Sequence, residues 1–206
     1  SLSRYVFNCS DVGINEVFAM VTDAHGNSTT VGFDVTVTDD ELPLLASILY
    51  VDASATGFGT GLSWANAYTN LDDALSSCYD GVDTIKVARG FYIPQTNHRS
   101  GGFSVNSDVV LLGGYPEGGG SNSTRDVSAL VTILSADIGT VGTKSDNAYH
   151  ALTIATYANC IIDGFTIAGG YANGSGALQS QGGGVLCLGK GRLNQCFIGD
   201  NHAYGA

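Results

Sequence analysis

The sequence predicts an all-β protein in two parts: a β-hairpin, followed by a chain that coils into stacked rungs of short strands beneath one capping helix. Glycine is abundant, at 29 of 206 residues, while only 13% of residues are charged, which favours tight turns and short strands over long salt-bridged helices. Apolar residues alternate along several short segments, as they do in half-buried strands. One such pattern, at residues 160–172, returns 31 residues later at 191–203.

The formal net charge of -11 argues against nucleic acid or anionic lipid as a partner, because binding to phosphate needs Lys and Arg. The charge fits an extracellular protein whose acidic loops hold cations. A surface kept soluble by negative charge is the alternative explanation. The sequence contains neither an apolar run long enough to span a membrane nor a signal peptide, and we expect residue 1 to lie inside a longer chain.

The first element is a hairpin within "NEVFAMVTDAHGNSTTVGFDVTVTDD" (15–40), where apolar residues alternate on both sides of the turn "DAHGNS". Residues 5–43 resemble the last part of a hyalin-repeat module, an immunoglobulin-like β-sandwich found along bacterial surface proteins. The resemblance implies a spacer or adhesive module, of which this chain would hold the C-terminal part at residues 1–41. Residues 42–48, which include Pro43, are predicted to be a linker.

The next element is one amphipathic helix that begins near residue 70. Thr69 or Asn70 can cap its N-terminus, and two aspartates follow in the first turn, where the helix dipole favours acids. Its apolar face is predicted to hold Leu71, Ala74, Leu75 and Cys78. A single helix at the head of a strand-rich chain suggests a cap, because the first rung of a coiled chain would otherwise expose apolar side chains.

Recurring strand patterns follow the helix. "TIKVARGFY" (84–92) matches "DVVLLGGYP" (108–116) at an offset of 24, which predicts Ile85 over Val109. Further strands are predicted in 130–139, 150–156 and 182–189. The repeat at offset 31 predicts stacked pairs and a shared corner, namely Ile162 over Leu193, Phe165 over Cys196, Ile167 over Ile198, Gly170 over Asn201 and Ala172 over Ala203.

Residues 49–206 resemble the right-handed parallel β-helix of bacterial surface proteins, a branch of the pectate-lyase-like superfamily. The segments that carry the resemblance are "YVDASATGFGTGLSWANAYTNLDDAL", "TILSADIG", "DGFTIAGGYA" and "GGGVLCLGKGRLNQCFIGDNHA". The resemblance implies a right-handed parallel β-helix with an N-terminal capping helix. Relatives usually continue for several turns, so we expect residue 206 to lie within a longer β-helix; the alternative is a last rung that meets another chain.

The resemblance admits polysaccharide lyases, which use an Arg or Lys base on a sheet face beside carboxylates that hold calcium. From Leu49 onward, no Arg or Lys recurs with acids at rung spacing. Asp163 and Asn194 are predicted to share one rung position, yet two side chains do not form an active site. No catalytic residue and no organic cofactor is therefore predicted.

Clustered carboxylates at the end of the hairpin are the one candidate metal site. Asp39, Asp40 and Glu41, beside Asp11 or Asp23, could hold a calcium ion. A solvated linker is the alternative, and it is favoured.

Histidine and cysteine spacing indicates no further metal site. His150 and His202 are predicted to be ordinary surface imidazoles. The cysteines show no CxxC spacing, so zinc is not expected; one disulfide among the last three is an alternative to simple packing, which is favoured. These cysteines are Cys9, Cys78, Cys160, Cys187 and Cys196.

We therefore expect an extracellular, non-catalytic bacterial surface protein, either an adhesin, a stalk or a filament-forming protein. Its expected partners are surface glycans or proteins of a host or neighbouring cell, with end-to-end self-association as a further option. The alternative is a secreted polysaccharide lyase or glycoside hydrolase whose catalytic rungs lie beyond residue 206.

Overall fold

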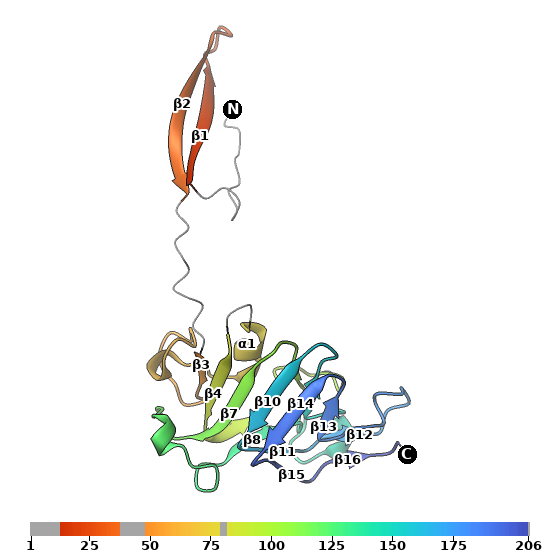
Figure 1. Cartoon of the computed structure of the whole chain (residues 1–206). Coiled ribbons are helices and arrows are strands. Elements are labelled where there is room, and N and C mark those ends of the chain that lie inside the picture. Colours follow the sequence, from red (N-terminus) through yellow and green to blue (C-terminus); the bar gives the residue numbers. More distant parts are fainter. Residues whose placement is uncertain (1–12, 38–47, 79–81, 206) are drawn as a thin grey trace. The chain divides into compact units, whose positions relative to one another are not determined.

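A computed structural model describes residues 13–37, 48–78 and 82–205 (Figure 1). Strands dominate these residues, and only one α-helix and three short 3-10 helices interrupt them. The protein is therefore all-β, as predicted. The chain divides into two compact units, Ser1–Leu44 and Leu45–Ala206, and each is described by itself.

The first unit contains an antiparallel hairpin of β1 (Gly13–Thr22) and β2 (Ser28–Val37). Val17 lies opposite Phe33, so the alternating apolar residues of the two strands share one face, as the sequence pattern predicted.

The turn of this hairpin is held by the carboxylate of Asp23. One of its oxygens accepts hydrogen bonds from the backbone N–H of His25 at 2.8 Å and of Asn27 at 2.9 Å. The Asn27 side-chain amide donates to the other oxygen at 3.0 Å. These bonds favour the ionised carboxylate, and the pKa of Asp23 is lowered, chiefly by the side chain of Asn27.

The described strands of the second unit form four parallel sheets, in which neighbouring strands come from different passages of the chain. In Figure 1, β4, β7, β10 and β14 run side by side. The five-stranded sheet holds β14 (Lys190–Asn194), β10 (Asn159–Asp163), β7 (Val110–Tyr115), β4 (Thr84–Ala88) and β3 (Ile48–Val51). The four-stranded sheet holds β15 (Phe197–Ile198), β11 (Phe165–Ala168), β8 (Thr132–Ser135) and β5 (Gly90–Tyr92). The other two consist of β13 (Val185–Cys187), β9 (Leu152–Ile154) and β6 (Phe103–Val105), and of β12 (Tyr171–Ala172) with β16 (His202–Ala203).

Alternate residues of these strands build the core. In the five-stranded sheet, one inward row runs through Leu49, Ile85, Leu111 and Ile162, which are paired in register and almost fully buried. Burying one such aliphatic side chain contributes about 1.5–3 kcal/mol. Stacking inward residues at corresponding positions of neighbouring strands therefore stabilises the sheets. The alternate residues of each strand point outward.

The predicted register between 84–92 and 108–116 is wrong. Ile85 pairs with Leu111 and not with Val109, so the true offset is two residues longer, and an irregularity follows between Lys86 and Ala88. A shift of two residues keeps every inward residue inward, so hydrophobic alternation could not distinguish the two registers.

The repeat at offset 31 is confirmed in all three sheets that it crosses. Ile162 pairs with Leu193, Ile167 with Ile198, and Ala172 with Ala203.

The predicted helix is α1 (Leu71–Ser76), and Asn70 caps it by accepting a hydrogen bond from the backbone N–H of Asp73 at 2.8 Å. The buried face of α1 packs near β3 and β6. The outer edge of β3 is also covered, because Tyr50 exchanges backbone hydrogen bonds with Gly61 and Tyr68. The remaining short helices are η2 (Trp64–Asn66), η3 (Asn122–Thr124) and η4 (Lys144–Asp146).

Candidate functional site

The outer side of the five-stranded sheet carries a row of side chains that the register aligns across all five strands. Its members alternate with buried core residues and therefore point outward. Together with the outward Lys190 and Arg192 of β14, this row is called the sheet face. The row consists of Tyr50, Lys86, Leu112, Asp163 and Asn194.

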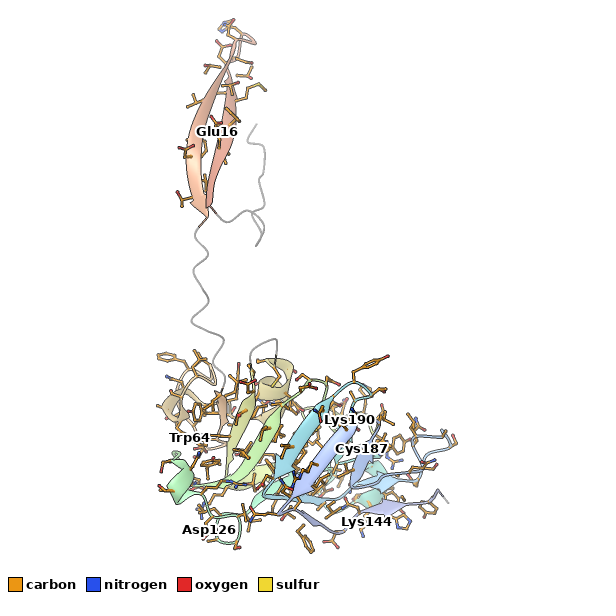
Figure 2. The ribbon with its side chains drawn as sticks, viewed as in Figure 1. Glu16, Trp64, Asp126, Lys144, Cys187 and Lys190 are labelled. Atoms are coloured by element: carbon orange, nitrogen blue, oxygen red, sulfur yellow. The ribbon has the colours of Figure 1, made fainter. Side chains whose placement is uncertain are left out.

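Aromatic rings flank one end of the sheet face. The ring of Trp64 lies 4.8 Å from that of Tyr50 and 5.3 Å from that of Tyr115, measured between centroids. The Lys86 ammonium lies 5.9 Å and 5.6 Å from the same two tyrosine rings, within cation–π range. Figure 2 labels Trp64 at this end of the sheet. The cluster places a cation between aromatic surfaces.

The loop after β7 fixes the Trp64 ring. The indole Nε1 donates to the carbonyl of Gly120 at 3.0 Å. Gly119 has a φ of +90°, and a Cβ there would lie 1.9 Å from Cγ of Trp64. Only glycine fits both the backbone conformation and the space at this position.

Arg125 neutralises Asp163, the one carboxylate in the row. Its guanidinium forms a largely buried ion pair with Asp163, and it also donates to the carbonyls of Gly113 at 2.7 Å and of Asp163 at 3.0 Å. A hollow of about 320 Å³ opens beside Arg125 and is lined by Asn122, Arg125, Asp126, Val127, Ser128 and Gln195.

Three of the chain's Lys and Arg side chains lie on the sheet face, while Asp83 and Asp108 line a hollow at one end of the same sheet with Asn159 and Ile161. The chain has only 8 Lys and Arg residues against 19 Asp and Glu. Lys86, Lys190 and Arg192 point outward from the sheet, and Arg125 lies beside it. Lys190 and Arg192 are exposed, and Arg192 donates to the Asn194 side-chain oxygen at 3.2 Å. Figure 2 labels Lys190 on β14 and Lys144 in the connection after β8.

The same row does not supply an acid–base pair. Lys86 and Asp163 lie on strands separated by β7, so two strand spacings of about 10 Å in total divide them. Proton transfer needs groups within hydrogen-bond reach, directly or through one water. The carboxylate of Asp163 is moreover committed to Arg125. The arrangement can bind polar groups, and it lacks the geometry for proton transfer between these two residues.

The predicted calcium ligands Asp39, Asp40 and Glu41 lie outside the described residues, as does Asp11. Asp23, which was their possible companion, uses its carboxylate to close the hairpin turn. Within the described ranges, no group of three or more His, Cys, Asp or Glu side chains is placed to hold a metal ion.

His150 is not a surface residue, so that prediction is wrong, whereas His202 is exposed as predicted. His150 is only 7% exposed, and its Nδ1 lies 3.0 Å from the carbonyl of Gly182. Burial lowers its pKa. His150 is directly followed by the fully buried residues Ala151 and Leu152. A single histidine carries no periodicity that would have predicted its burial.

The described cysteines are free thiols, and Cys9 lies outside the described residues. Cys160 is buried and Cys196 partly buried, as the packing interpretation expects, whereas Cys187 is exposed, so that interpretation is wrong for Cys187. Burial raises the pKa of Cys78 and of Cys160 to about 11, and it also raises that of Cys196. These three thiols are therefore protonated at neutral pH and behave as small apolar groups.

Comparison with known proteins identifies no relative: no protein-family model, no curated protein and no solved structure matches this chain. In the described part of the chain, no helix combines the length and the apolar character needed to cross a membrane.

The pairing of Asp163 with Asn194 was predicted and is confirmed, but the sheet face as a whole was not. Lys86 lies between two buried residues, Ile85 and Val87, so alternation alone could have placed it on the outer face. Its alignment with Tyr50 and Asp163 depends on the lengths of the connections between strands, for which the sequence offers no periodic signal.

Proposed function

We propose that the protein is an extracellular, non-catalytic bacterial surface protein that binds acidic polysaccharides through the sheet face of a right-handed parallel β-helix. The observation that carries this proposal is that three of the eight Lys and Arg residues, Lys86, Lys190 and Arg192, point outward from one face of a chain with net charge -11. The hairpin of β1 and β2 belongs, in this proposal, to an immunoglobulin-like spacer module.

The parallel sheets support the β-helix. The chain passes from β4 through β5 and β6 before it returns as β7, the parallel neighbour of β4. Crossovers between parallel strands of one sheet are right-handed in about 98% of cases. Each passage would form one rung, and α1 with the 61–68 loop would cover the first rung.

Charge supports an anionic ligand. Lys190 and Arg192 are exposed, so their donors can reach carboxylate or sulfate groups, and arginine forms paired hydrogen bonds to such groups. The Trp64 and Tyr50 rings next to Lys86 offer apolar surface for the sugar rings themselves. A long acidic glycan could thus contact successive rungs through several weak interactions.

Binding without turnover is supported by the geometry of the row. Lys86 and Asp163 are about two strand spacings apart, and Asp163 is paired with Arg125. The lyase or hydrolase alternative places its general base and acid in rungs beyond residue 206, so the geometry of this row concerns only the residues of the sheet face.

The test compares charge-removing variants of equal size. Polygalacturonate and neutral amylose serve as probes in a sedimentation or calorimetric binding assay. The double variant Lys190→Gln/Arg192→Gln is expected to bind polygalacturonate about fivefold more weakly, because two exposed ion pairs are lost. Lys144→Gln, in the loop of η4, removes one exposed positive charge away from the sheet and should bind normally.

Equal binding of amylose and polygalacturonate, or equal loss with Lys144→Gln, would contradict the proposal. Product analysis by mass spectrometry distinguishes the enzymatic alternative. Intact polygalacturonate after long incubation is expected, and shortened chains would favour a lyase or hydrolase.

A further inference from the structure

A second group of exposed side chains lies away from the sheet face, on the pair of strands β12 and β16. Tyr171 and His202 are register partners, and their rings stack at 5.2 Å with an interplanar angle of 26°. The ring of Tyr204 meets His202 edge-on at 4.6 Å and Tyr171 edge-on at 6.1 Å. These three residues are called the ring cluster.

We propose that the ring cluster is a binding site for neutral sugars, in which the apolar C–H face of one pyranose ring lies against the ring of Tyr204, with His202 and Tyr171 beside it. This inference goes beyond the sheet face and concerns a different ligand class. An aromatic face carries partial negative charge, and sugar C–H groups carry partial positive charge, so the two surfaces attract each other.

The rings point outward, which separates the ring cluster from core packing: Ala172, the next residue of β12, is fully buried and pairs with Ala203, so alternation places Tyr171 and His202 on the outer side. Tyr204 is 65% exposed and His202 is also exposed, whereas Tyr171 is partly covered. The cluster thus presents aromatic surface to solvent in a fixed arrangement.

Backbone hydrogen bonds fix the segment that carries the outer two rings. The N–H of His202 donates to Gly170 at 2.8 Å, and that of Tyr204 donates to Ala172 at 3.0 Å. The next residue, Gly205, donates to Ser180 at 2.6 Å. A binding surface that is already ordered loses little entropy when the ligand arrives.

Arg99 holds the backbone at Tyr171, the most covered of the three rings. Its guanidinium donates to the Tyr171 carbonyl at 2.9 Å and to the Asn173 side-chain oxygen at 2.6 Å. Its Nε donates to the Asn147 carbonyl at 2.7 Å, and the guanidinium lies 4.3 Å from the ring centroid of Tyr149. Through these bonds Arg99 fixes the backbone at Tyr171, and it is therefore a positioning residue of the ring cluster.

The polar atoms of the ring cluster fit a neutral, hydroxylated ligand. The phenol oxygens of Tyr171 and Tyr204 lie 3.4 Å apart, and each can donate to or accept from a sugar hydroxyl. Tyrosines combine apolar contact area with a polar tip at low conformational cost, which suits recognition of sugars.

The test uses cellohexaose and maltohexaose as probes, with binding followed by saturation-transfer NMR and by calorimetry on the whole chain. Wild-type protein is expected to bind at least one of them. Tyr204→Ala and His202→Ala should each weaken binding about fivefold, because each removes one ring contact. Tyr204→Leu keeps apolar area but loses the ring and should also weaken binding, while unchanged thermal melting shows that the fold is intact.

Tyr157→Ala is the matched control, since Tyr157 is 94% exposed in the turn between β9 and β10 and lies outside the ring cluster. Lys190→Gln/Arg192→Gln should leave binding of the neutral probes unchanged, which separates this inference from the acidic-glycan proposal. Absence of binding to both probes, or equal weakening by Tyr157→Ala, would show that the three rings only pack against one another on the surface.

Discussion

Asn201 shows how a single side chain holds a corner of the fold. Its amide nitrogen donates to the carbonyls of Ile167 and Gly199, each at 2.8 Å, and its amide oxygen accepts from the N–H of Gly170 at 2.9 Å. Only Asn or Gln offers both donors and an acceptor, and Asn has the shorter reach. Asn201 therefore ties the corner before β16 to the corresponding corner after β11.

Replacing Asn201 by Ala should lower the free energy of unfolding by about 1–3 kcal/mol, because partly buried backbone groups lose their partners. Asn201→Asp should also destabilise, since a carboxylate cannot donate to the two carbonyls. Urea denaturation measures both effects. Asn106→Ala, at an exposed position, is the control, and an equal loss there would mean that the corner bonds are unimportant.

His150 makes stability depend on pH. Burial lowers its folded pKa, so below the unfolded pKa of about 6.5 the unfolded state binds more protons than the folded state. The stability that neutral His150 allows is present above that pH and is lost as pH falls toward the folded pKa.

The expected result is that the wild type loses more stability than His150→Gln between about pH 7.5 and pH 5.5, since Gln does not titrate. Denaturation curves at several pH values give the slope of unfolding free energy against pH for each protein. Because His150→Gln keeps every carboxylate, its slope measures the contribution of the carboxylates alone. Identical slopes for the two proteins would show that His150 is not held neutral by the fold.

At the scale of elements, hydrophobic alternation predicted the strands well and placed β4 beside β7 and β10 beside β14, but it did not predict the register of β4 against β7. It identified both strands of the hairpin, the helix and the repeated segments. The pairing of Ile85 with Leu111 was missed because a two-residue slip leaves the inward set unchanged. The repeat between 160–172 and 191–203 succeeded because its turns and its corner residues recur along with the strands.

The cap of α1 gives a test at this scale, because the sequence left Thr69 and Asn70 as alternatives. Asn70→Ala removes the acceptor for the Asp73 N–H and should destabilise by about 1 kcal/mol. Thr69→Ala, one residue earlier, should have little effect. Thermal melting compares the two, and a larger effect of Thr69→Ala would place the start of the helix one residue earlier.

Gly119, in the loop after β7, packs against Trp64 at one end of the sheet face. A methyl group at this position would collide with the Trp64 ring, and the positive φ disfavours any side chain. Gly119→Ala should therefore change the fluorescence of Trp64, the only tryptophan of the chain, and weaken polygalacturonate binding. Gly118→Ala, which meets no atom within 4 Å but also has a positive φ, separates backbone strain from the collision.

At the scale of the whole molecule, composition predicted an acidic, strand-rich protein but not where its few cations gather. Lys86 and Arg192 are far apart in sequence, and their common face arises only when β4, β7, β10 and β14 stack in register. The two proposed glycan sites differ in charge: the sheet face is cationic, and the ring cluster is aromatic and neutral in character.

The most direct test of the account is a crystal structure of the chain with an acidic oligosaccharide such as hexagalacturonate. The account predicts right-handed winding of the strands, with sugar carboxylates in hydrogen-bond contact with Lys190 and Arg192 and a sugar ring near Trp64. Left-handed winding, or an oligosaccharide bound away from the sheet face, would contradict it.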